Sequence, residues 1–268
     1  MKYLYNEIGK KDVLNMAQNL LRSGALYQRD VDGKLEADGK LAWETPWYHV
    51  HPHESINCQL WSAFMWKVMF QSLPKWVTRG RQFLPSGCQN CFKVVVRPQT
   101  LKALFALAKV QEGLNRPCKC GIERRAYVFG NYGGYFYNRG LKQGIECYQE
   151  VRKAVDDEPE LGPDVKVILK RACTEMEELA GPSDKWEIFE DQMEIETEIY
   201  ETFNIDNQKR SQSRMGINYV KARWVEHAYS VGDITALDYI DPDRPIYPPY
   251  VTYHHMKVED LEPGPVSK

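Results

Sequence analysis

The sequence has no long uninterrupted apolar run. Its most apolar window, residues 56–73, contains six polar residues: Asn57, Gln59, Ser62, Lys67, Gln71 and Ser72. A membrane-spanning helix needs about 20 mostly apolar residues, so we expect no span and no membrane partner. The first residues, MKYLYNEIGKKDV, include no apolar stretch typical of a secretory signal. We therefore predict a soluble, cytoplasmic protein.

Familiar catalytic motifs are also missing from the 268 residues. The sequence contains no G-x-x-x-x-G-K-[ST] phosphate loop, no G-x-G-x-x-G, no G-x-S-x-G and no H-E-x-x-H. Its 43% apolar content is that of a globular protein and excludes collagen-like, low-complexity and coiled-coil classes. No residue is assigned a catalytic role on this basis, and whether the chain is an enzyme stays open.

Acidic residues are scarce in one part of the chain and concentrated in another. Residues 64–139 hold 13 Lys and Arg but only Glu112 and Glu123, whereas residues 156–206 hold 17 acidic residues against four basic ones. A basic block of this size favours a polyanionic partner, because Lys and Arg replace the counterions along a phosphate backbone. The alternative is that the two blocks face each other inside the fold or between subunits.

The first predicted region is residues 1–63. Apolar periodicity predicts a helix over 12–22, with Asp12 as its N-cap. Asp-Gly dipeptides at 32–33 and 38–39 lie between short alternating runs and predict hairpin turns. A further helix, apolar nearly all around and therefore deeply buried, is predicted over 56–73.

The second predicted region, residues 64–180, is a basic core in which strands and helices alternate. Strands are predicted over 92–96, 120–128 and 165–169, and helices over 100–114, 140–155 and up to residue 179. This alternation predicts an α+β or α/β fold, with a mixed sheet covered by helices.

Two further regions complete the predicted organisation. Residues 181–240 read as an acidic helical region, with helices over 185–203 and 218–231. Residues 241–268 are rich in proline and aromatic residues and predict an extended tail. We expect the four regions to form one compact unit.

Four of the seven cysteines form two close pairs, C-x2-C and C-x-C: Cys88, Cys91, Cys118 and Cys120. Close thiolate pairs bind one tetrahedral ion, so the spacing predicts a structural zinc site that stabilises the basic core. An iron–sulfur cluster on the same thiolates, or ordinary packing of reduced thiols, are the alternatives. If the strands that begin near Cys91 and Cys120 are parallel neighbours, both pairs lie at one end of the sheet. The other three, Cys58, Cys147 and Cys173, are expected to pack in the core.

Three histidines, His49, His51 and His53, alternate along the chain. In an extended strand such residues share one face, so they form a second candidate metal site, one with an open catalytic position. The alternative is a surface loop that leads into a helix.

The segment 130–140 combines glycines with aromatic residues and ends near an arginine. Glycine lets a backbone approach a ligand closely, and Tyr132, Tyr135 and Tyr137 are candidates for stacking on bases. The alternative is a glycine turn that joins two aromatic strands of a core. The candidate phosphate contacts are Arg79, Arg81, Lys93, Arg97, Arg124, Arg125 and Arg139.

Together these patterns favour a zinc-stabilised nucleic-acid-binding protein, for DNA or RNA, with a basic, aromatic surface. One alternative is an interaction protein that assembles, as an oligomer or with another protein, through its complementary charge blocks. The other is a metalloenzyme that uses the histidine cluster.

Overall fold

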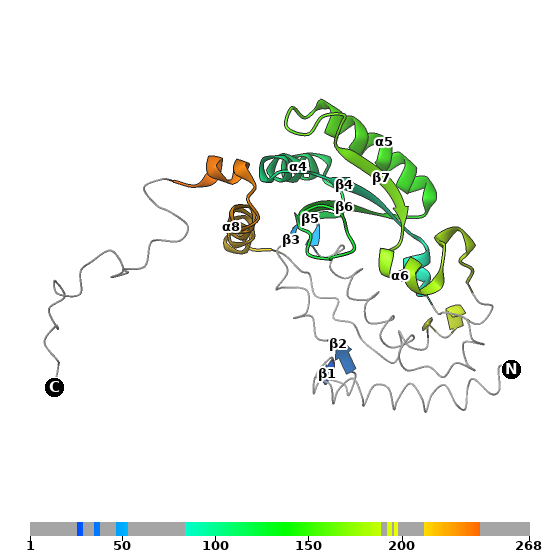
Figure 1. The fold of residues 1–268 in the computed structure, drawn as a ribbon. Coiled ribbons are helices and arrows are strands. Elements are labelled where there is room, and N and C mark those ends of the chain that lie inside the picture. Colours follow the sequence, from blue (N-terminus) through cyan, green and yellow to red (C-terminus); the bar gives the residue numbers. More distant parts are fainter. Residues whose placement is uncertain are drawn as a thin grey trace, which may run out of the picture.

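The computed structural model describes residues 26–28, 35–37, 47–52, 84–188, 192–194, 196–197 and 212–241. Its centre is a five-stranded sheet in which every pairing is antiparallel, layered against helices (Figure 1). The predicted α+β class is thus confirmed, and the parallel α/β alternative is wrong. The strand order is β3 (Trp47–Val50), β5 (Cys118–Ile122), β6 (Tyr132–Arg139), β4 (Cys91–Arg97) and β7 (Lys166–Arg171).

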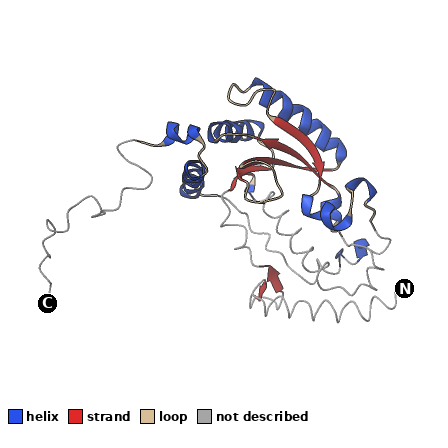
Figure 2. Cartoon of the chain, viewed as in Figure 1, coloured by secondary structure: helices blue, strands red, loops and turns tan. Residues whose placement is uncertain are grey.

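Four of these strands and two helices form a β-α-β-β-α-β unit. The chain runs from β4 through α4 (Leu101–Leu114) to β5 and β6, then through α5 (Leu141–Asp157) to β7. Both helices cover the same face of the sheet (Figures 1 and 2). Because β6 lies between β4 and β5, these two strands run parallel to each other without being neighbours.

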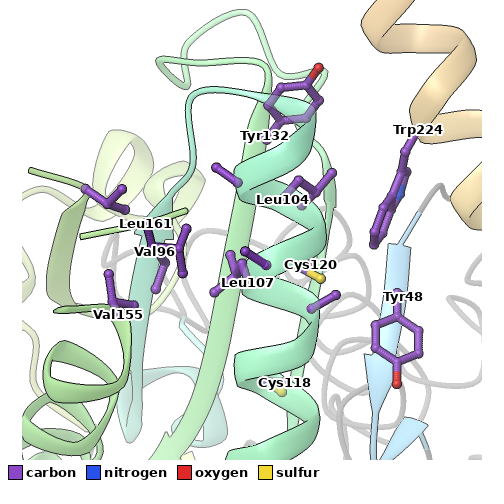
Figure 3. Close-up of a cluster of buried hydrophobic side chains, with 14 of the residues drawn as sticks. Tyr48, Val96, Leu104, Leu107, Cys118, Cys120, Tyr132, Val155, Leu161 and Trp224 are labelled. Carbon is purple, nitrogen blue, oxygen red and sulfur yellow. The ribbon is translucent and has the colours of Figure 1, made fainter. Parts of the chain in front are cut away.

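Helix α4 follows directly from its sequence. The Thr100 hydroxyl accepts a hydrogen bond from the Ala103 amide at 3.1 Å, which caps the first turn. Leu101, Leu104 and Leu107 then recur on one face and are completely buried against the sheet (Figure 3). Asn115 ends the helix in the left-handed conformation, with φ 49°.

Strand β6 corrects the interpretation of the glycine-aromatic segment as a turn. Gly133 and Gly134 lie inside the strand, where each leaves room for a side chain on a different face of the sheet. A Cβ on Gly134 would lie 2.5 Å from Leu107 Cδ2 of α4, and one on Gly133 would lie 2.8 Å from Arg97 Nη1. The glycines therefore allow close packing on both sides of a buried strand.

Asp233 joins three parts of the fold near the end of helix α8 (Arg214–Ser230). Its carboxylate accepts hydrogen bonds from the Leu101 amide at 2.6 Å and from the Tyr132 hydroxyl at 2.8 Å. It also caps the 3-10 helix η3 (Ile234–Tyr239) through the Thr235 amide. Burial alone would raise the pKa of Asp233, but these hydrogen bonds outweigh burial and lower it.

The remaining elements are shorter. A separate two-stranded sheet pairs β1 (Leu26–Gln28) with β2 (Leu35–Ala37) in antiparallel fashion, on either side of the predicted turn at 32–33. The second predicted turn, at 38–39, and the segment that follows it to residue 46 lie outside the described residues. The short helices are α3 (Ser86–Gln89), α6 (Thr174–Ala180) and η2 (Ser183–Lys185).

Several predicted segments lie outside the described residues. They are the helices over 12–22 and 56–73, most of the acidic helix over 185–203, and the tail after residue 241. In the described ranges, no helix combines the length and the hydrophobicity needed to cross a membrane.

Two glycine substitutions test the packing of α4 on β6. Gly134→Ala places a methyl group against the buried Leu107 side chain, so we expect a loss of about 1–3 kcal/mol in the free energy of unfolding. Gly113→Ala, in the same α4 but with open space around it, is the matched control and should gain about 0.5–1 kcal/mol. Urea unfolding monitored by circular dichroism measures both, and a neutral Gly134→Ala would contradict the close approach.

Candidate functional site

The two faces of the central sheet carry different chemistry. On the face covered by α4 and α5, the strands contribute apolar side chains such as Val94, Val96 and Phe136. We call the opposite side the cationic face. Its residues alternate with those of the core face: Trp47, His49, Lys93, Val95, Arg97, Lys119, Tyr135, Tyr137 and Ile168.

The structure does not bring the four predicted metal-binding cysteines together. Cys118 and Cys120 lie on the core face of β5, are fully buried and pack among apolar side chains (Figure 3). Cys91 lies on the other face of the sheet, in register with Arg139 of β6, whereas Cys120 is level with Val96. This register separates Cys91 and Cys120 by roughly 17 Å along the strand direction, at about 3.4 Å per residue.

The fourth cysteine belongs to yet another cluster. Cys88, in α3, packs with Leu84, Ala172 and Met176. Burial raises the pKa of Cys118 and Cys120, which favours the thiol over the thiolate that zinc or an iron–sulfur cluster needs. In the described part of the chain, no group of three or more His, Cys, Asp or Glu residues is arranged to hold a metal ion. The four cysteines as placed do not fit the predicted zinc site.

The histidines are separated as well. His49 is buried on the cationic face, where burial and the charge of Lys119 lower its pKa to about 3. His51 follows the end of β3 with φ 54°, so the strand alternation stops before it. The exposed His51 ring lies with Nε2 3.0 Å from the Asn115 carbonyl oxygen. His53 lies outside the described residues.

Half of the ten predicted nucleic-acid contacts meet at the cationic face: Lys93, Arg97, Arg125, Tyr135 and Tyr137. The other described residues lie apart from this group. Tyr132 is buried on the core face, and Arg124 is exposed on the loop between β5 and β6. Arg139 is on the cationic side but exposed at the far end of β6, in register with Cys91. Arg79 and Arg81 lie outside the described residues.

Tyr135 is the centre of the cationic face. Four cations lie within 6 Å of its ring centroid: Arg97 at 5.3 Å, Lys119 at 5.8 Å, Arg125 at 5.8 Å and Lys93 at 5.9 Å. The electron-rich ring attracts such cations electrostatically. Trp47 packs edge-on against Tyr135 at 5.6 Å, and Lys119 lies 4.4 Å from the Trp47 ring. Two aromatic rings therefore keep several like charges close together.

A buried carboxylate balances part of this charge. Glu123 accepts a hydrogen bond of 2.5 Å from the Tyr135 hydroxyl and a bidentate pair, at 2.8 and 2.6 Å, from Arg125. Arg125 also donates to Glu175 at 3.0 Å, and Tyr127 donates to the same oxygen at 2.7 Å. Burial alone would raise the pKa of Glu123, but the hydrogen bonds from Arg125 and Tyr135 lower it to about 2.

The positive potential of this face also acts on Lys119. Burial, together with the neighbouring charges of Lys93 and Arg125, lowers the pKa of Lys119 to about 7. Among the described residues, Lys93, Arg97, Lys119 and Arg125 surround Tyr135, while Glu123 and Glu175 both pair with Arg125. A region of this kind attracts anions.

Sequence reasoning missed Trp47, Lys119 and Glu175 as parts of this face. The predicted strand over 120–128 begins two residues late, and β5 begins at Cys118. With the correct start, Lys119 falls between two core cysteines and so on the opposite face, which is the signal that would have identified it. Trp47 and Glu175 come from distant segments, and no local pattern connects them to the face.

Chemically, the cationic face combines fixed positive charge with aromatic side chains, which suits a ligand that carries phosphate groups and flat rings. Comparison with known proteins gives no further guide, because no family model, curated protein or solved structure matches the chain. The contacts of the cationic face are therefore the basis for a functional proposal.

The role of Glu123 predicts an acid-sensitive contribution to stability. Because its pKa lies below the ordinary 4.5, its contribution is complete above pH 4.5 and is lost as the pH falls towards about 2. Glu123→Gln should lower the free energy of unfolding by about 2–3 kcal/mol at pH 7 and flatten its fall with acid. Glu150→Gln, which removes an exposed partner of Arg116, is the control and should cost less than about 1 kcal/mol. Equal losses in the two variants would contradict the assigned role.

The separation of the cysteines also gives a test. Cys91→Ser should leave the zinc content per chain unchanged, because Cys91 shares no metal with Cys118 and Cys120. Elemental analysis of protein purified without chelator measures this content. A loss of about one zinc per chain in the variant would show that the four thiols do meet around one ion.

Proposed function

We propose that this chain binds single-stranded nucleic acid at the cationic face. The observation that carries the proposal is the convergence on one sheet face of five residues that the sequence singles out: Lys93, Arg97, Arg125, Tyr135 and Tyr137. They come from β4, from β6 and from the loop after β5, so the antiparallel order of the sheet is what brings them together.

The division of exposure within the face suggests separate roles. Tyr135 and Lys93 are only 5% and 6% exposed, so they form a buried support. Arg97, Lys119, Arg125 and Tyr137 are partly exposed above this support. The proposed ligand contacts are therefore the guanidinium groups with phosphate and the Tyr137 ring with a base, while Tyr135 and Glu123 hold the arginines in place.

The aromatic part of the face favours a single strand over a duplex. Bases in a duplex are already stacked and present only their edges, whereas an unpaired base offers its flat face to an aromatic ring. Four-stranded sheets with aromatic side chains on the open face bind single-stranded RNA in this manner. In this chain β4–β7 belong to a five-stranded sheet, and Tyr137 is a partly exposed aromatic side chain on its cationic face.

Ion pairs within the chain weaken the alternative of assembly through the two charge blocks. Arg125 of the basic block is bound to Glu175 of the acidic block at 3.0 Å, and Lys102 to Glu160 at 2.9 Å. These pairs satisfy part of each block without a second subunit. Nucleic-acid binding is therefore the better supported proposal.

Fluorescence anisotropy with labelled oligonucleotides tests the proposal. Arg97→Gln and Lys119→Gln should each weaken binding and reduce the salt slope of the logarithm of affinity by about 0.7 per lost phosphate contact. Tyr137→Leu should lose about 1 kcal/mol in binding free energy with single strands but leave the salt slope unchanged. Lys109→Gln and Lys142→Gln, on α4 and α5 on the other side of the sheet, are the charge-matched controls.

Two results would contradict the proposal. One is that the control variants weaken oligonucleotide binding as much as the cationic-face variants do. This would mean that nucleic acid is attracted to basic surface in general and not to the cationic face. The other is tighter binding of duplex than of single strands by the wild type, since a base that stays paired gains nothing from Tyr137. Circular dichroism establishes that each variant is folded before its affinity is compared.

A further inference from the structure

A second chemical feature lies at the edge of the cationic face, where β7 leads into α6. Cys173 precedes α6 and is partly exposed, and it packs, as expected, against a hydrophobic cluster that includes Ala172 and Met176. Strand alternation alone would point it to the core face, but Ala172 has φ 51°, which is rare for a residue with a side chain. The turn at Ala172 brings the Cys173 sulfur to Lys93 on the opposite side.

The contact between Lys93 and Cys173 is close and well enclosed. Lys93 Nζ donates to Cys173 Sγ at 3.0 Å, and Lys93 is only 6% exposed. Cys91, two residues before Lys93 on the same strand face, adds a second sulfur whose charge acts on the lysine. Burial alone would lower the pKa of Lys93, but the neighbouring cysteines outweigh burial and raise it, so the amine is held as an ammonium.

An ammonium at this distance favours the thiolate form of cysteine, which is the nucleophilic form. We propose that Cys173 is a reactive thiolate, activated by Lys93 and modified by peroxides. Its sulfur attacks one peroxide oxygen, the O–O bond breaks, and the second oxygen leaves with a proton as water or an alcohol. Cysteine is oxidised by two electrons to the sulfenate, and the peroxide is reduced by two. This inference is independent of nucleic-acid binding.

The cysteines of the same chain supply internal references. Cys147 is completely buried in α5 and should react only when the protein unfolds, so its labelling reports on folding. Cys173 is partly exposed and lies beside an ammonium. The difference between the two therefore separates activation from general access to reagent.

The experiment measures the rate of alkylation of each cysteine by iodoacetamide between pH 5 and 9, by mass spectrometry of the full chain. We expect Cys173 to react about tenfold faster at pH 7 than it does in Lys93→Met, because the ammonium lies 3.0 Å from the sulfur. Lys93→Arg keeps the charge and should retain most of the rate. Lys102→Met removes an exposed lysine of α4 and should change nothing. Peroxide followed by dimedone should label wild type at Cys173 and not Cys173→Ser.

Two outcomes would overturn the proposal. The first is an equal Cys173 rate in wild type and Lys93→Met, which would show that the lysine does not activate the sulfur. The second is a dimedone adduct that persists in Cys173→Ser, which would place the oxidation elsewhere. If Cys147 becomes labelled in Lys93→Met, that variant is unfolded. The test then uses the Cys173 rate in Lys93→Arg, and a rate no faster than that of an ordinary exposed thiol overturns the proposal equally.

Discussion

The alternation of side chains along five antiparallel strands is the constraint on which the rest of the structure depends. One face of the sheet meets the leucines of α4, and the other carries Lys93, Lys119 and Tyr135. A shift of one residue in any strand would exchange these sets and place charges in the apolar core. The glycines at 133 and 134 fit the same constraint, since each leaves space for a neighbour on its own face.

On the cationic face, the repulsion between neighbouring positive charges is offset by aromatic rings and by the Glu123 carboxylate. Tyr135 contributes its ring to four cations and its hydroxyl to Glu123, so one side chain serves both kinds of interaction. Glu123 in turn holds Arg125, which reaches Glu175 of the acidic block. The strong sequence asymmetry between basic and acidic blocks is thus in part an internal pairing.

The local sequence pattern was sufficient to predict the helices and strands that have a strong hydrophobic periodicity or a capping residue. Helix α4 begins after Thr100 and ends at Leu114, as predicted, and β4, α5, β7 and α6 lie where the periodicity places them. For the segment that forms β6, the sequence left open a ligand-binding loop or a glycine turn, and the reason for Gly134 is a leucine on a helix nearly thirty residues earlier. Half of the candidate contacts lie on the cationic face, and the sequence could propose them because basic and aromatic residue types are visible in any sequence.

The sequence by itself determined a sheet covered by helices, the main helices, and the concentration of basic and aromatic residues in the core region. These features can be predicted from the sequence because they depend on residue type and on hydrophobic periodicity along the chain. Only the tertiary structure decided which residues meet. The insertion of β6 between β4 and β5 separates Cys91 from Cys120, and the strand alternation puts them on opposite faces. The same insertion places Tyr135 between Lys93 and Lys119, because pairing across strands, unlike spacing along one, is settled by the packing of the whole sheet.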